Sequence, residues 1–123
     1  MNLNLSEEQQ FIQQTARDFA EKELVGNAAK LDAGQGQDEF LTNLKKLADL
    51  GFMGLNVDAE YGGTEAGAVA FSLAISSIAR GCASTAVTVS VTNMVAEVIQ
   101  SVASVEQKQN YLPKPCSLEF HIL

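Results

Sequence analysis

The residues best suited to chemistry in this sequence are few, and their spacing matches no catalytic or metal-binding set. Cys82 and Cys116 are the two cysteines and His121 is the one histidine, too few at the wrong spacing for a zinc site. Tyr61-Gly62-Gly63 has no following Gly-Lys-Ser/Thr, so it predicts a turn and not a phosphate loop. Glu97 lies in a polar strip, where a lone carboxylate is usually solvated. We therefore predict no catalytic, cofactor-binding or metal-binding residue, and we expect both thiols to be reduced.

Composition and charge exclude several classes of partner. The 123 residues suffice for one domain, and 46% hydrophobic with 19% charged residues is ordinary for a globular protein. The formal net charge is −7 and the eight lysines and arginines are scattered, which argues against nucleic acid and anionic membranes as partners. The polar start Met1-Asn2-Leu3-Asn4 is unlike a secretory signal, and no apolar run reaches the roughly 18 residues of a membrane span. A cytoplasmic location is expected.

Capping residues and glycines divide the first half of the chain into two helices. Ser6-Glu7-Glu8-Gln9 has the form of a capping box and predicts a helix that ends near Gly26. Asp38 is expected to cap a second helix, which ends at Gly51 because glycine suits a left-handed C-terminal cap. The other stretches are predicted to be a loop over 27–37, a buried connector over 52–57 and a glycine turn over 58–65.

The second half predicts three further helices. A helix over 66–80 is rich in Ala, Ser and Gly, which would let a neighbouring backbone approach closely. The segment 84–105 is the longest, and Ser104-Val105-Glu106-Gln107 begins a last short helix that Pro113 stops. The predicted fold is all-α, a small bundle of four main helices plus a short terminal helix.

The segment 84–105 carries two competing patterns. Alternation of Val87, Val89 and Val91 with Thr and Ser favours a strand, but it stops at Asn93. Valines also recur at spacings of three and four along the whole segment, which predicts a helix whose valine stripe faces the core. One narrow strip would stay uncovered by this stripe: Ala86, Ser90, Asn93, Glu97, Gln100, Ser101 and Ser104.

Three motifs in the same order resemble acyl-CoA dehydrogenases over about residues 5–117. The central motif is Leu50-Gly51-Phe52-Met53-Gly54-Leu55 followed by Glu60-Tyr61-Gly62-Gly63. Leu5-Ser6-Glu7-Glu8-Gln9 is similar to the start of the family's first helix, and Glu106-Gln107-Lys108-Gln109-Asn110-Tyr111-Leu112-Pro113 to a later segment. The resemblance implies domain boundaries at 1–117, an N-terminal helical domain, and 118–123, an unmatched tail.

The resemblance also implies a function. The family uses FAD to remove hydrogen from the α and β carbons of acyl-CoA thioesters in fatty acid metabolism. Its subunits add a β domain and a C-terminal helical domain, assemble as oligomers, and pass electrons to an electron-transferring flavoprotein. The family's catalytic base and most flavin contacts come from those other domains, so this chain alone is expected to bind no FAD and to be inactive. Exposed apolar surface is expected to cause self-association.

Residue-by-residue matching to the family places Ala86, Ser90 and Met94 on the acyl side of the substrate cavity, with Asn93 adjacent. The first three lie at i, i+4 and i+8, in one row of a helix. Small side chains at Ala86 and Ser90 would leave room for a short or medium acyl chain. The competing interpretation is that this strip is simply the solvated face of an amphipathic helix. A second hypothesis for the whole chain is a free-standing helical interaction module that reuses this domain.

Overall fold

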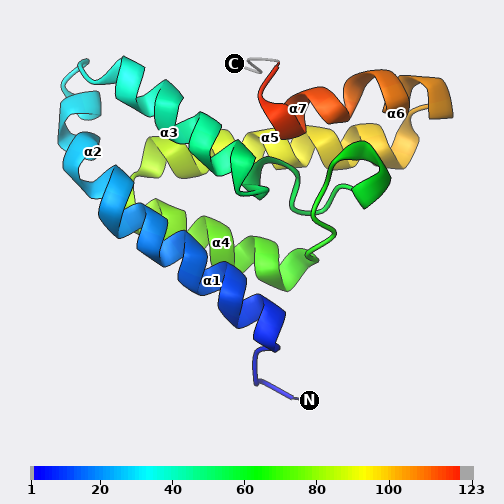
Figure 1. Cartoon of the computed structure of the whole chain (residues 1–123), viewed down its shortest axis with the longest axis horizontal. Helices are drawn as coiled ribbons and strands as arrows, with labels where there is room; N and C mark the ends of the chain where they lie inside the picture. Colours follow the sequence, from blue (N-terminus) through cyan, green and yellow to red (C-terminus); the bar gives the residue numbers. More distant parts are fainter. Residues whose placement is uncertain (1, 120–123) are drawn as a thin grey trace.

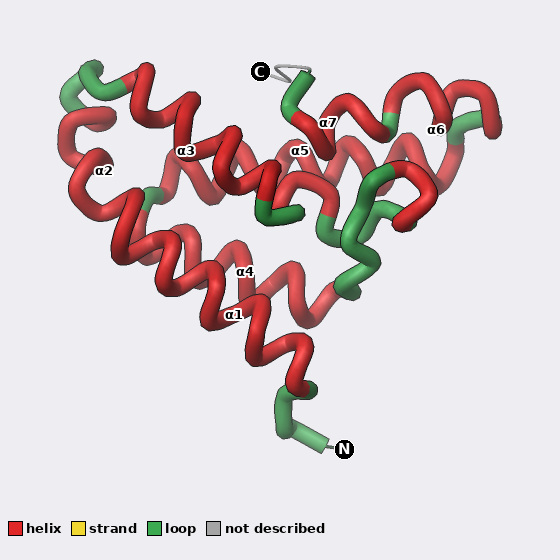
Figure 2. The backbone as a smooth tube through the Cα atoms, viewed as in Figure 1, coloured by secondary structure: helices red, strands yellow, loops and turns green. Residues whose placement is uncertain are grey.

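The computed structural model describes residues 2–119, and this part of the chain is helical without strands (Figures 1 and 2). The all-α prediction is therefore confirmed, and the strand alternative for the longest segment is wrong. In chain order the helices are α1 (Glu7–Phe19), a π-helix η1 (Ala20–Leu24), α2 (Val25–Asp32), α3 (Gln37–Asp49), α4 (Ala68–Gly81), α5 (Ala83–Val102), α6 (Val105–Tyr111) and α7 (Pro113–Ser117).

Helices α1, α4 and α5 form the centre of the bundle. α1 packs along α4 and α4 packs along α5, while α3 lies across α5 (Figure 1). The predicted close approach at α4 is confirmed, because a Cβ added at Gly81 would crowd the Cβ and carbonyl oxygen of Ala20. The core is made of fully buried, mostly apolar side chains from all of these elements, among them Ala16, Leu47, Met53, Ala74, Ile78 and Val89.

The predicted caps at the helix starts are confirmed where they rest on serine. Ser6 and Ser104 each accept a hydrogen bond from the backbone N–H three residues on, and Gln9 and Gln107 return the bond. Both ends thus satisfy backbone donors that a helix start leaves unpaired. At α3 the cap is Gly36 and not Asp38, so the helix begins two residues earlier than predicted.

The predicted helix end at Gly26 and loop over 27–37 are wrong. Helical backbone continues from α1 through η1 into α2 and ends at Asp32, which leaves only a short turn before α3. Gly26 is exposed in mid-helix, where glycine costs about 1 kcal/mol relative to alanine and does not by itself end a helix. Asn27 donates to the Gly36 carbonyl at 3.0 Å, which ties α2 to the start of α3.

The connector between α3 and α4 is buried as predicted. Gly51 adopts the left-handed conformation at φ 87°, and the following 3-10 turn η2 (Phe52–Gly54) turns its side chains into the core. A second 3-10 turn, η3 (Ala59–Tyr61), ends at Gly62, whose φ of 91° fits the predicted glycine turn. Backbone hydrogen bonds from Thr64 and Ala66 back to the connector close the loop.

The C-terminal part contains one helix that the sequence pattern did not reveal. The four predicted main helices are α1, α3, α4 and α5, and the short terminal helix is α6. α7 follows because Pro113 starts a new helix at its first position, where no N–H is needed. The predicted domain boundary at 117 stays a prediction, and four residues of the predicted tail, 120–123, lie outside the described part.

Candidate functional site

Helix α5 carries every residue predicted to contact substrate, so its orientation decides the site. The face of α5 that packs on the bundle consists of small and polar residues: Thr85, Ala86, Val89, Thr92, Asn93 and Ala96. The predicted valine stripe points the other way, with Val87 62%, Val98 56% and Val102 78% exposed. The prediction that the valines face the core is therefore wrong. Small residues occupy the inner face because they let α4 and the connector approach the α5 backbone.

We define the α5 outer face as Val87, Val91, Met94, Val98 and Val102. These residues recur at three- and four-residue spacing and form one apolar stripe along the solvent side of the helix. Val91 is half-buried and the other four are exposed. Contiguous exposed apolar surface is uncommon on globular proteins and often marks a contact site.

The predicted substrate row crosses from the inner to the outer side of α5. Ala86 is buried in the main core, Ser90 is half-buried, and Met94 is 55% exposed at the edge of the outer face. The residues of the row therefore become more exposed from Ala86 to Met94. Only its Ser90 and Met94 end is open to a ligand on this side, and the substrate role of all four residues stays a prediction.

Asn93 is 1% exposed, and its carboxamide binds the backbone. Its Oδ1 accepts from the Leu55 N–H at 2.7 Å, while its Nδ2 donates to the carbonyls of Phe52 at 2.9 Å and Val89 at 2.8 Å. Both N–H donors of the amide thus have partners. Asn93 fixes the connector to α5, a role that the sequence analysis did not anticipate.

Two further polar residues of the α5 strip, one and two turns after Asn93, also bond the connector. Gln100 accepts from the Asp58 N–H at 2.8 Å and donates to the Asn56 carbonyl at 3.2 Å. Glu97 accepts from the Asn56 side chain at 2.9 Å. The strip was expected either to line a cavity or to be solvated. Instead, Asn93, Glu97 and Gln100 form hydrogen bonds with the backbone and side chains of residues about forty positions earlier. No local pattern reveals such partners.

Two groups near the connector have perturbed acidity. Burial raises the pKa of the Cys116 thiol, and a hydrogen bond with its own backbone opposes the change. Desolvation raises the pKa of Tyr61, and the negative charges of Glu60 and Asp58 act in the same direction. Both changes favour the neutral form of the group. Cys82 and Cys116 are free thiols, and the described residues contain no group of side chains that could hold a metal ion.

None of the described helices combines the length and apolar character needed to cross a bilayer. α5 is long enough to be considered, but threonine, serine, asparagine and glutamate interrupt its apolar sequence.

Comparison with known proteins identifies relatives of the whole described chain. A family model for the acyl-CoA dehydrogenase N-terminal domain matches residues 6–119. The mitochondrial short-chain specific acyl-CoA dehydrogenase of Rattus norvegicus is 41% identical over 113 residues, which are 90% of this chain and 27% of the relative. The short-chain specific acyl-CoA dehydrogenase of Clostridium acetobutylicum is 34% identical over 114 residues, 91% of this chain and 29% of the relative. The chain thus spans less than a third of the length of these relatives.

Solved structures agree with this comparison. A glutaryl-coenzyme A dehydrogenase in complex with glutaryl-CoA has a TM-score of 0.81 at 31% identity, covering 98% of this chain and 31% of that one. An acyl-CoA dehydrogenase from Bacillus anthracis complexed with FAD gives 0.82 at 27% identity, with 94% and 20% covered. A chain from a study of the electron transferring flavoprotein of Acidaminococcus fermentans gives 0.83 at 28% identity, with 95% and 30% covered.

Proposed function

Because the chain belongs to the acyl-CoA dehydrogenase family and corresponds to its N-terminal domain, we propose that it is the helical part of an enzyme that dehydrogenates acyl-CoA thioesters. The active form is a longer subunit that binds FAD and passes electrons to an electron-transferring flavoprotein. The match to residues 6–119 and the relative complexed with FAD support this proposal. Oxidation of a thioester between its α and β carbons is the proposed reaction.

In this proposal α5 forms the acyl side of the substrate cavity. Ser90 and Met94 contact the hydrocarbon chain, because they lie where the row of predicted residues reaches the edge of the α5 outer face. Ala86 and Asn93 shape the cavity from beneath, as part of the packed inner side of the helix. The small Ser90 side chain and the short-chain specificity named for the relatives favour a short acyl chain. The observation that carries the proposal is that Ser90 and Met94 become accessible next to the apolar α5 outer face.

The described residues do not fit FAD without further chain. Within residues 2–119 the buried side-chain atoms that lack a hydrogen-bond partner are Asn27 Oδ1 and Asn56 Oδ1, which are both acceptors. A pyrophosphate needs donors or positive charge, and α5 carries neither lysine nor arginine. The flavin and the base for α-proton abstraction are therefore assigned to other parts of the subunit. The 123-residue chain alone is proposed to be inactive.

The cavity assignment is tested by changing Ser90 to Leu in the intact enzyme. A larger side chain should shorten the cavity and lower kcat/KM for octanoyl-CoA relative to butanoyl-CoA by about tenfold or more, the usual effect of one to a few methylenes in an apolar pocket. Ser101→Leu makes the same change on an exposed part of α5 outside the row and should leave the ratio unchanged. An unaltered chain-length profile in Ser90→Leu would contradict the cavity assignment.

The α5 outer face also supports a second candidate, a free-standing helical interaction module. A stripe of exposed valines would serve a separate partner protein as well as it serves the rest of a subunit. The mass and flavin absorbance of the natural protein distinguish the two. A yellow subunit of the length of the relatives supports the enzyme, and a colourless protein near 13 kDa supports the module.

A further inference from the structure

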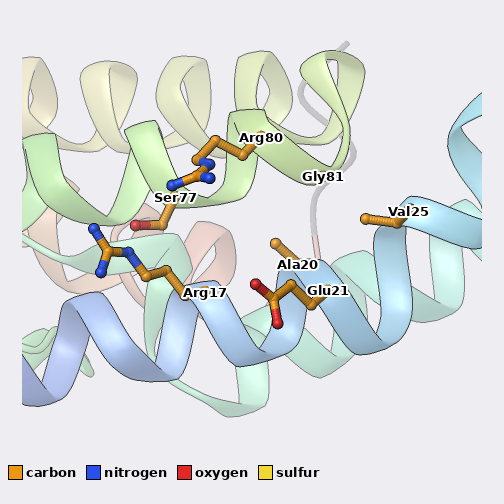
Figure 3. Close-up of a pocket in the computed structure, with 7 residues that line it drawn as sticks. All are labelled: Arg17, Ala20, Glu21, Val25, Ser77, Arg80 and Gly81. Carbon is orange, nitrogen blue, oxygen red and sulfur yellow. The ribbon is translucent and has the colours of Figure 1, made fainter.

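A pocket between α1 and α4 lies apart from the α5 outer face. It has a volume of about 140 Å³ and is bordered by the end of α1, the π-helix η1 and the last turns of α4. Figure 3 shows the guanidinium groups of Arg17, from α1, and Arg80, from α4, on either side of the Ser77 side chain. Two positive side chains from different helices thus border one small cavity.

Neither arginine is neutralised by the described part of the chain. Arg17 and Arg80 are exposed and form no ion pair or hydrogen bond with another described residue. Glu21 also borders the pocket but lies beyond ion-pair distance of both. In the same π-helix, Glu23 forms an ion pair with Lys46 of α3 at 3.1 Å, so nearby surface charges do pair when they are within reach. The two arginines, with like charge, therefore border the pocket without a direct ion pair to a described residue.

The walls of this pocket fix the backbone positions of the two arginines relative to each other. Gly81 packs against Ala20 so closely that an added Cβ would have to displace it. Ser77 is 3% exposed, and its hydroxyl donates to the Leu73 carbonyl at 2.7 Å, which fixes its side chain. The third wall is the π-helix η1, a form of helix that occurs often at functional sites. The packed helices therefore need no rearrangement, and the entropy lost on binding is that of ordering the two exposed side chains.

We propose that Arg17 and Arg80 form a binding site for a small oxyanion, a phosphate or a carboxylate. Guanidinium groups present planar pairs of N–H donors that match both groups in a bidentate geometry. The pocket borders hold two positive charges and one negative charge, Glu21, so an anion completes the neutralisation. Free phosphate and small carboxylates both offer this chemistry. The site is separate from the proposed substrate cavity on α5.

The sequence makes this proposal simple to test, because Arg17 and Arg80 are its only arginines. The Nε–H region of a nitrogen–proton NMR spectrum of the 123-residue chain should therefore show two arginine signals. Arg17→Lys and Arg80→Lys, which each remove one signal, assign them. The chain is titrated with sodium phosphate and, separately, with sodium acetate, at an ionic strength held constant with sodium chloride.

The chemical shifts of both arginine signals are expected to change saturably with phosphate, with acetate or with both. The anion with the lower dissociation constant is the preferred oxyanion. Arg80→Gln, followed through backbone amides around Ser77, should weaken binding about tenfold, the effect of losing one charged hydrogen bond. Glu21→Gln should strengthen it. Lys22→Gln removes one positive charge from η1 outside the pocket border and should keep the dissociation constant within about twofold.

Two results would overturn the proposal. One is the absence of saturation with both anions, or an equal response to sodium chloride alone. The other is an equal loss of affinity in Lys22→Gln and Arg80→Gln, which would show that net charge and not the pocket binds the anion. Circular dichroism of each variant confirms that it is folded, as expected for exposed positions.

Discussion

The side chain of Asn93 connects two segments that are far apart in sequence. It pairs with backbone groups of Phe52 and Leu55 inside the bundle, where an unpaired polar group is unfavourable. A single carboxamide therefore sets where the connector lies against α5. The connector in turn supports the part of α5 that reaches the proposed cavity.

Replacing Asn93 with Ala should destabilise the domain strongly. The Leu55 N–H and Phe52 carbonyl would lose their buried partner, and two such losses cost about 2–4 kcal/mol of unfolding free energy. Urea unfolding followed by circular dichroism measures this change. Asn110→Ala, on an exposed position of α6, should change the unfolding free energy by less than about 0.5 kcal/mol. Equal stability of the two variants would contradict the role given to Asn93.

The role of Asn93 was not predictable from the sequence, although the residue itself was singled out. Its spacing relative to Ala86 and Ser90 placed it near a row of interest, but its partners are carbonyl and N–H groups about forty residues away. A local pattern identifies a polar residue on an apolar helix. It does not identify the distant backbone that makes the polar residue favourable there.

At the scale of elements, the connector contains a glycine whose surroundings leave no room for a side chain. A Cβ added at Gly63 would overlap the Val57 carbonyl oxygen and carbon, which belong to the backbone and cannot move aside freely. Gly26, by contrast, has open space around it in the middle of a helix. The two glycines therefore provide a matched pair for the same substitution.

Gly63→Ala and Gly26→Ala should change stability in opposite directions. The first should lower the unfolding free energy by about 1–3 kcal/mol through overpacking. The second should raise it by about 0.5–1 kcal/mol, because alanine is the better helix former. Thermal or urea unfolding of both variants measures the difference. A stabilising Gly63→Ala would mean that the connector is looser than the structure shows.

Helix α5 shows how far periodicity alone can predict an element. The spacing of its valines correctly predicted a helix, and the prediction of its extent was close to Ala83–Val102. The same spacing could not say which face is inside, because residues around most of the helix are apolar or small. Close packing selected the face with Ala86 and Ala96, and hydrogen bonds with the connector reinforced that choice.

At the scale of the whole molecule, the order of the four main helices and α6 was predictable because local signals mark their ends, whereas α2 and α7 were missed. Serine caps, Gly51 and Pro113 are local signals that act through the backbone. The proposed substrate cavity could be approached only through the family resemblance, because a cavity between domains needs residues from both sides. The relatives are more than three times as long as this chain, and the proposal assigns that other side to the rest of the subunit.

The isolated chain should self-associate through the α5 outer face. Exposed Val98 and Val102 lie one turn apart, so replacing both with Lys should abolish association and leave the unfolding free energy nearly unchanged. Sedimentation velocity over a range of concentrations measures the oligomeric state. A control with Gln109→Lys and Asn110→Lys adds comparable positive charge on exposed parts of α6 and should still associate. A wild-type chain that stays monomeric at every concentration would contradict this expectation.

The π-helix between Phe19 and Val25 holds one more residue than an α-helical turn would need. The wide turn absorbs that residue, so α2 keeps the facing that packs it on the bundle. If the same residues wound as ordinary α-helix instead, everything after the turn would rotate by about 100° around the axis. Asn27 would then face away from Gly36. A change in the winding of this one turn, without any change in sequence, would therefore disconnect α2 from the start of α3.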